Sequence, residues 1–406
     1  MKRYVGFLSK PIAPYRIITF SVGLLSGLGI VMVLSASAVK SFEQTGSSYS
    51  IFLKQLLFFT IAIASLNIAS RMKIEIWQKI GKIAIPLAIF GLLMPQLPII
   101  GKEINGNKSW IALGPFTLQP AEFAKLLLIL FIATRLVIFE KKVERYKNGL
   151  SDEKMGPWSL IVDLAPGMLA MLVLIMAGKD LGTALIVGGI GILMIYLCGT
   201  PMRQMFVVLL GALLAAGALV VTQPHRVSRF AAFLHPFDPE VYKFAGWQTA
   251  HSVMGLASGG FFGVGLGASK QKWGNLSEAN TDFIFSVIGE ELGLLGTLAV
   301  LFTFGALIYG ILRTAINTKN HFEKFAVAGI GSWLLLQVIV NVASDIGVFP
   351  VIGVTLPFIS YGGSSLIANY LGIAFVLNVL RRDPAIREEL THAKHRRAKA
   401  VKEVRR

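Results

Sequence analysis

The sequence predicts an all-α membrane protein that crosses the bilayer ten times, and three observations support this fold class. The 406 residues are 54% hydrophobic and only 15% charged, whereas soluble domains carry roughly 25% charged residues. Long apolar runs recur along the whole chain, and lysine and arginine gather in alternate connections between them. The one cysteine, Cys198, excludes a disulfide framework and a cysteine-based metal site.

Apolar runs of about 18–25 residues can cross the hydrocarbon core as helices. The first run is longer than the roughly 7–15 residues of a signal-peptide core, so we interpret it as a retained span. Prolines interrupt the third and fifth runs, which membrane helices tolerate when their neighbours satisfy the freed backbone groups. The ten predicted spans are 17–39, 51–70, 80–100, 119–138, 159–177, 181–198, 205–222, 283–312, 325–348 and 354–380.

The basic residues predict the orientation of these spans. If both termini are cytoplasmic, the inside segments hold 28 lysines and arginines and the outside segments hold 9, as the positive-inside rule requires. A cytoplasmic segment, 1–16, then precedes a transmembrane domain, 17–380. A large outer loop, 223–282, joins the seventh and eighth spans. The basic cytoplasmic tail, 381–406, is typical of contact with anionic membrane lipids rather than with nucleic acid.

The polar stretch 101–125 leads into the fourth span and carries charges into it. Pro120 suits the first turn of a helix, where its missing N–H costs little. Glu122 and Lys125 lie three residues apart on one helical face and can pair. Each charge alone at mid-membrane costs roughly 2.5–3.5 kcal/mol, so we expect an ion pair that only fixes the helix, or a wet functional cavity. Trp110 is either an interfacial anchor or a functional residue of this outer loop.

Two aspartates precede predicted spans on the outer side. Asp180 stands before the sixth span and Asp282 before the eighth. Each is either the N-cap of its helix or a chemical group in an outward cavity, where an aspartate can act as a general base on a hydroxyl. Along a helix from Asp282, Glu290 lies about 80° around the axis and Glu291 nearly opposite. We therefore expect one glutamate to face a cavity with Asp282 while the other packs or pairs elsewhere.

Residues 356–370, LPFISYGGSSLIANY, open the tenth predicted span. Gly362, Gly363, Ser364 and Ser365 combine flexible backbone with hydrogen-bond donors at the start of a helix, which suits an anionic group. Small residues also permit close packing between membrane helices. The sequence leaves both interpretations open.

Taken together, these elements resemble the SEDS family of shape, elongation, division and sporulation proteins. The resemblance extends from Ser35 to Ser365, and its GLGASKQK and VIGEELGLLG segments are more similar to FtsW-type division members than to RodA-type elongation members. The family's usual LPEAHTDF reads LSEANTDF here, with Ser277 and Asn280 replacing proline and histidine, and Asp345 lies in a stretch expected to be apolar. The matching motifs are NGNKSWIALGPFTLQPAEFAK, GKDLGTA, GVGLGASKQKW, TDFIFSVIGEELGLLG and SYGGSS.

The resemblance implies a peptidoglycan glycosyltransferase that polymerises lipid II at the outer face of the bacterial cytoplasmic membrane, at the division septum. It implies a class B penicillin-binding protein as the transpeptidase partner, alongside other membrane proteins of the division machinery. Asp282 matches the aspartate regarded as essential in the family, and Trp110 matches a functionally important tryptophan. Glu122, Lys125 and Asp180 match residues that line the central cavity. Further candidates for this cavity are Lys108, Gln119, Lys270, Lys272, Glu290, Ser360, Gly362, Gly363 and Ser364.

The expected reaction is an inverting glycosyl transfer in which Asp282 takes the proton of the acceptor hydroxyl. Helix-start amides, a divalent cation such as Mg²⁺ or Mn²⁺, or one of Lys108, Lys270 and Lys272 would stabilise the lipid diphosphate that leaves. Two other functions fit the sequence. Intramembrane polar residues also suit a flippase that moves lipid II across the bilayer, and a non-catalytic scaffold for division partners needs no base at all.

Overall fold

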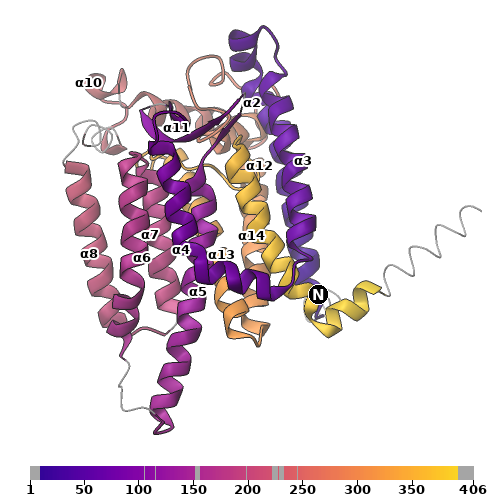
Figure 1. Cartoon of the computed structure of the whole chain (residues 1–406). Coiled ribbons are helices and arrows are strands. Elements are labelled where there is room, and N and C mark those ends of the chain that lie inside the picture. The colour runs from indigo at the N-terminus through magenta and orange to yellow at the C-terminus, as the bar shows by residue number, and fades with distance from the viewer. Residues whose placement is uncertain are drawn as a thin grey trace, which may run out of the picture.

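The computed structural model describes residues 10–104, 106–114, 116–150, 156–197, 199–221, 227, 233–244 and 246–391. These residues form a bundle of long helices with one small sheet at one end (Figure 1). The long helices are α2 (Ala13–Thr45), α3 (Ser50–Ala69), α4 (Ile74–Leu93), α5 (Pro120–Lys147), α6 (Pro157–Ala177), α7 (Leu181–Leu197), α8 (Met202–Val221), α12 (Ile284–Asn317), α13 (His321–Asp345) and α14 (Gly363–Arg382).

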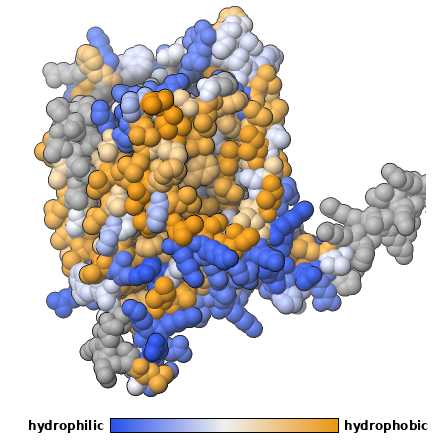
Figure 2. Space-filling model, in the orientation of Figure 1, coloured by the Kyte–Doolittle hydropathy of each residue, from blue (hydrophilic) through white to orange (hydrophobic). Residues whose placement is uncertain are grey.

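The outer surface of this bundle is apolar. Among the described residues, seven helices are long and apolar enough to cross a membrane: α2, α3, α4, α6, α12, α13 and α14. Phe20, Phe206 and Phe302 are 71%, 65% and 79% exposed, and a soluble protein rarely shows so much contiguous apolar surface. Figure 2 shows the hydrophobic side chains as a broad band between two hydrophilic ends. The chain is therefore a multi-pass membrane protein.

Each of the ten predicted spans overlaps one of the long helices, but several predicted boundaries were wrong. The tenth helix begins at Gly363 rather than at 354. Pro357 disfavours a helical conformation at the residue before it, and Phe358 adopts a positive φ of 65°, so residues 346–362 form a loop. The third helix runs from 74 to 93, six residues earlier than expected at its start. It ends where Pro95 enters a short 3₁₀ turn, Met94–Gln96.

The centre of the bundle is formed by α5, α13 and α14. In the apolar windows of α13 and α14, 72% and 83% of the residues are buried, whereas the corresponding share in α3 is 17%. The helix α13 packs against α5, α7 and α12, and α14 packs against α3 and α5. Polar side chains on these central helices are consequently enclosed by protein rather than by lipid.

A three-stranded antiparallel sheet, which the all-α prediction omitted, occupies residues 101–118. It contains β1 (Gly101–Ile104), β2 (Asn107–Leu113) and β3 (Phe116–Leu118), in the order β1-β2-β3. Gly106 and Gly114 take positive φ angles of 79° and 62°, which the turns between short strands require and glycine adopts without strain. The sequence signal was present in these two glycines, but the stretch lies between two spans and was interpreted only as an outer loop.

The long connection between α8 and α12 contains two further helices, α10 (Pro239–Tyr242) and α11 (Trp247–Ser258), and α11 packs on α12. Residues 222–226, 228–232 and 245 of this connection lie outside the described residues. In Figure 1, α10, α11 and the sheet gather at one end of the bundle, whereas the C-terminal helical segment that follows α14 lies towards the other end. The loops singled out from the sequence thus meet at a single end of the molecule.

Candidate active site

Three helix starts converge at the end of the bundle that carries the sheet. Asp180 accepts hydrogen bonds from the Thr183 amide (2.9 Å) and hydroxyl (2.8 Å), so it caps α7. The Gln119 side chain donates to the same carboxylate at 2.7 Å from the residue before α5. The Gln119 amide donates to Ser364 Oγ, in the first turn of α14, at 2.9 Å. Burial raises the pKa of Asp180, which the hydrogen bonds from Thr183 oppose.

The predicted ion pair between Glu122 and Lys125 is present one turn deeper. The ammonium of Lys125 lies 2.9 Å from Glu122 Oε2, and both side chains are buried. Lys125 also donates to Gln337 of α13 (3.3 Å) and lies 5.2 Å from the ring centroid of Trp333. Gln337 in turn donates to the Thr355 carbonyl at 2.9 Å. The charged pair is therefore part of a polar chain that links α5, α13 and the loop before α14.

The sheet is fixed to the connection between α6 and α7. The Lys108 amide donates to the Gly178 carbonyl (3.0 Å), and Ser109 Oγ donates to the same carbonyl (3.1 Å). The Lys108 ammonium donates to the Gln96 carbonyl at 3.2 Å. Trp110 follows on β2, opposite Lys102 of β1, and is partly buried. Its strand therefore holds Trp110 beside the loop that carries Asp180.

Asp282 lies in a partly buried turn that is held from two sides. The Asn341 side chain of α13 donates to the Asp282 carbonyl and to the Val354 carbonyl, both at 2.7 Å. Ser360 Oγ donates to the Thr281 carbonyl at 2.6 Å. A Cβ built on Gly353 would lie 3.5 Å from Asp282 Oδ2, so the carboxylate stands against this glycine. Ser360 thus acts through the main chain before Asp282.

Of the two roles predicted for Asp282, the N-cap is not the one that its position gives it, because Asp282 lies one residue before the N-cap. The N-cap of α12 is Phe283, which makes no side-chain cap hydrogen bond. Asp345, from the end of α13, takes this role, because its Oδ2 accepts from the Ser286 amide at 3.0 Å. The sequence offered no explanation for Asp345 because its partner lies 59 residues away.

Glu290 and Glu291 both hold the loop of residues 269–272. We had expected one glutamate to face a cavity with Asp282 and the other to pack or pair elsewhere. Glu290 accepts hydrogen bonds from the amides of Lys270 (2.9 Å) and Gln271 (3.4 Å) and from the Ser269 hydroxyl. Glu291 forms a buried ion pair with Lys272 at 3.1 Å. The helical angle estimated from Asp282 does not apply, because α12 begins only at Ile284. In consequence Lys272 is enclosed, whereas the Lys270 side chain is exposed.

Gly363, the first residue of α14, allows close packing between helices. A Cβ on Gly363 would lie 2.6 Å from the Phe58 ring, so only glycine lets α14 approach α3 this closely. The Gly362 amide donates to Gln55 of α3 at 3.4 Å.

Among the described residues, no group of three or more His, Cys, Asp and Glu side chains is placed to hold a metal ion. Within the described residues, these side chains therefore do not form a preassembled metal centre.

Comparisons with known proteins cover nearly the whole chain. A family model described as "Cell cycle protein", FTSW_RODA_SPOVE, matches residues 15–384. This chain belongs to that family. Two solved structures are similar to this FtsW/RodA/SpoVE chain, and each similarity covers 90% of it. The first, described as "Structural coordination of polymerization and crosslinking by a peptidoglycan synthase complex", has a TM-score of 0.71, 27% identity and 96% coverage of its own chain. The rod shape determining protein RodA of Thermus thermophilus has a TM-score of 0.63, 26% identity and 95% coverage.

Relatives of known name lie in the same family. Stage V sporulation protein E of Bacillus subtilis is 33% identical over 375 residues, which are 92% of this FtsW/RodA/SpoVE chain and 98% of the relative. The probable peptidoglycan glycosyltransferase FtsW of Coxiella burnetii is 35% identical over 362 residues, 87% of this chain and 93% of the relative. The SEDS resemblance recognised in the sequence is thereby confirmed.

The polar face of α13 was not predicted from the sequence. Gln337, Asn341 and Asp345 are spaced by four residues in an apolar helix, so they share one face. They contact, in order, Lys125, the Asp282 carbonyl and the Ser286 amide. Polar residues repeated at this spacing in a membrane helix were a usable signal, since such groups face the protein interior.

Proposed function

We propose that this chain is a peptidoglycan glycosyltransferase that polymerises lipid II into glycan strands at the outer face of the cytoplasmic membrane. Relatives 32–36% identical to it carry the name of this enzyme. The observation that carries the proposal is the position of Asp282. Its carboxylate belongs to a turn that hydrogen bonds from Asn341 and Ser360 hold in place. This turn lies at the end of the bundle where the sheet and the starts of α5, α7 and α14 converge.

We infer ten spans with both termini in the cytoplasm. The excess of lysine and arginine, 28 against 9, lies on the side of the termini, and the outer loops lie together at the other end of the bundle (Figure 1). The named FtsW relatives support a location at the division septum.

In the proposed reaction Asp282 accepts the proton of the acceptor sugar's 4-hydroxyl. The hydroxyl oxygen forms a bond to the anomeric carbon of the donor, the bond to the lipid diphosphate breaks, and the configuration inverts. A diphosphate leaves as an anion, so one base suffices, unlike the two carboxylates of glycoside hydrolysis. The prenyl tails of both substrates lie against apolar helix faces.

Different groups are proposed to bind the substrate. Lys270 is suited to the diphosphate, because Glu290 fixes its main chain while its side chain remains exposed. Lys272 supports the same loop through its ion pair with Glu291. The proposed polar wall of the site consists of Gln119, Glu122, Lys125 and Asp180. Trp110 and Ser364 are proposed to lie at its rim.

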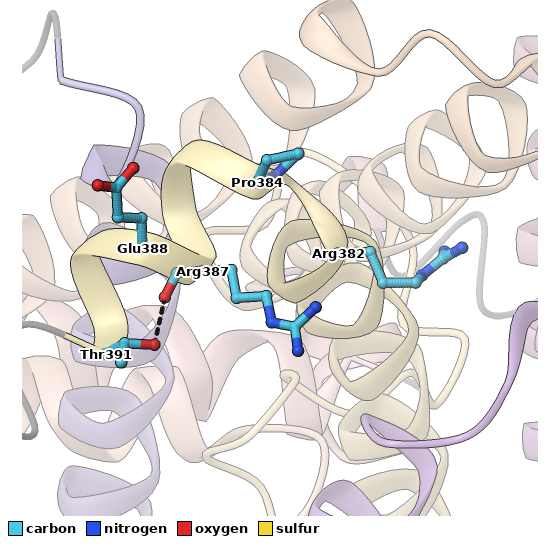
Figure 3. Close-up of a pocket in the computed structure, with 5 residues that line it drawn as sticks. All are labelled: Arg382, Pro384, Arg387, Glu388 and Thr391. Atoms are coloured by element: carbon cyan, nitrogen blue, oxygen red, sulfur yellow. Dashed lines mark hydrogen bonds between the residues drawn. The ribbon is translucent and has the colours of Figure 1, made fainter.

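The proposed partner is a class B penicillin-binding protein, because a similar structure belongs to a complex that coordinates polymerization and crosslinking. Other division membrane proteins would join this pair. Anionic lipids are proposed to bind the basic tail, of which residues 392–406 lie outside the described residues. Figure 3 shows the recess where this tail leaves the bundle, lined by Arg382, Pro384, Arg387, Glu388 and Thr391.

The direct test replaces Asp282 with Asn and measures lipid II polymerisation by the purified, partner-bound protein. Loss of a positioned general base lowers the rate by about 10²–10⁴-fold, so we expect a drop of at least about a hundredfold. Undiminished polymer synthesis would remove Asp282 from the reaction.

The same variant separates the alternatives. A flippase would move lipid II across liposome membranes without forming polymer, and the movement would persist in Asp282→Asn. A scaffold would recruit its partner while neither the wild-type protein nor the variant formed polymer. Polymer formation by the wild-type complex but not by the Asp282→Asn complex supports the glycosyltransferase.

A further inference from the structure

Asp345 is a buried carboxylate that the proposed reaction does not use. Its side chain is 0% exposed, and it is the last residue of α13. One oxygen, Oδ2, accepts from the Ser286 amide at 3.0 Å, while Oδ1 has no hydrogen-bond partner among the described residues. Burying a carboxylate with one oxygen unsatisfied costs free energy, so its presence here calls for a compensating role.

The Asp345 side chain makes its hydrogen bond at the start of α12. Ser286 is in the first turn of α12, where amide groups lack the usual helical partner four residues earlier. Its amide makes a 3.1 Å hydrogen bond to the Phe283 carbonyl, and Asp345 Oδ2 is its second acceptor, at 3.0 Å. Since the N-cap residue Phe283 has no side-chain oxygen to offer, Asp345 supplies the cap from another helix.

Asp345 and Asn341 hold the main chain on both sides of Phe283. Asn341, one turn earlier on α13, donates to the Asp282 carbonyl at 2.7 Å, and Asp345 accepts from the Ser286 amide. The Ser252 hydroxyl of α11 donates to the Asp345 carbonyl at 2.8 Å, which fixes the end of α13 itself. The turn that carries the Asp282 carboxylate is thus set by one face of α13.

We propose that Asp345 is a positioning residue for the glycosyl transfer, which acts by capping α12 from α13 and so holds Asp282 at the distance the acceptor hydroxyl requires. This inference rests on the proposed role of Asp282. The contribution depends on where the Asp345 oxygen lies rather than on its charge. Displacement of a reacting group by about 1 Å can cost up to about a hundredfold in rate.

Two substitutions separate position from charge. Asp345→Asn keeps an oxygen at the position that accepts from Ser286 and removes the charge. Asp345→Glu keeps the charge and moves the oxygens outward by one methylene. In the partner-bound protein we expect the kcat for lipid II polymerisation to stay within about threefold for Asp345→Asn and to fall about tenfold or more for Asp345→Glu, with KM nearly unchanged.

Controls test whether the effect passes through Asp282. Ser344→Ala removes a neighbouring buried hydroxyl, which bonds to the Val340 and Pro350 carbonyls, and should leave kcat unchanged. Added to Asp282→Asn, Asp345→Glu should cause no further loss, because residues acting as a unit are not additive. If Asp345→Glu fails to fold, as judged by thermal unfolding and partner binding, Asp345→Ala replaces it with the same expectation.

The outcomes distinguish the two proposals. A normal kcat in Asp345→Glu, an equal loss in Asp345→Asn, or a loss confined to KM would overturn the positioning role. If Asp282→Asn is inactive while Asp345→Glu is fully active, only the positioning role fails. If Asp282→Asn polymerises lipid II normally, the general-base proposal fails first.

Discussion

Asp180 and Asp282 show how one local pattern leads to two structural roles. Each aspartate stands before an apolar helix, and each was a candidate N-cap. Asp180 is a cap, with Thr183 three residues later as its partner. Asp282 precedes the N-cap position of α12, where Asp345 replaces it as the capping group.

The ion pair of Glu122 and Lys125 allows a residue-scale prediction about stability. Lys125→Met leaves the Glu122 carboxylate buried without its partner and should lower the free energy of unfolding by about 3–5 kcal/mol. The double variant with Glu122→Gln carries no unpaired charge and should be more stable than Lys125→Met alone. Thermal and denaturant unfolding in detergent measure both values. A double variant less stable than the single one would contradict this account.

At the scale of elements, the glycine-rich stretch 259–267 supplies hydrogen bonds to α12 where that helix is interrupted. Gly293 interrupts α12 with φ 68° and ψ −165°. The amides of Val264 and Gly265 donate to the carbonyls of Glu290 and Glu291, at 2.9 and 3.1 Å, which would otherwise lack partners at the break. The stretch therefore satisfies the backbone of α12 while the two glutamate side chains hold the loop that follows it.

Gly293→Ala tests this arrangement. A Cβ at this position would lie 2.3 Å from the Gly263 amide nitrogen, and the positive φ strains any other residue. We expect a loss of at least about 1–3 kcal/mol in the free energy of unfolding. Faster hydrogen exchange in residues 260–273 should accompany this loss.

Gly305→Ala, on the same helix, is the matched control. A Cβ there meets no atom within 4 Å, and its φ is not positive. Because alanine favours the helix, Gly305→Ala should be neutral or should stabilise by up to about 1 kcal/mol. Equal destabilisation by both substitutions would show that the break at Gly293 has no special role.

At the scale of the whole molecule, the proposed orientation gives a labelling prediction. In a Cys198→Ala background, a cysteine replacing Lys102 of β1 should react with a membrane-impermeant maleimide on intact cells. A cysteine replacing Thr391 should react only after permeabilisation. Phe302→Cys, on the lipid-facing surface, should remain unlabelled in both cases. Labelling of Thr391→Cys from outside would reverse the orientation.

Much of the architecture was accessible from the sequence because membrane spans leave a strong local signal. Each predicted span overlaps a helix, and the Glu122–Lys125 pair follows from helical spacing alone. The sheet at 101–118 and the loop before Gly363 were missed, because short strands and extended loops depend on what they pack against. Three side-chain contacts join residues far apart along the chain: Gln119 with Asp180, Lys272 with Glu291 and Asp345 with Ser286, which are 61, 19 and 59 residues apart.

The sequence by itself determined the membrane class, the approximate positions of the helices, the family and the identity of Asp282 as the candidate base. These properties depend on composition, periodicity and motifs, which are local. Only the tertiary structure decided that Asp345 caps α12, that Glu290 and Glu291 hold one loop, and that Lys272 is enclosed while Lys270 is exposed. The physical reason is that buried polar groups must find partners, and in a helical bundle those partners come from other helices.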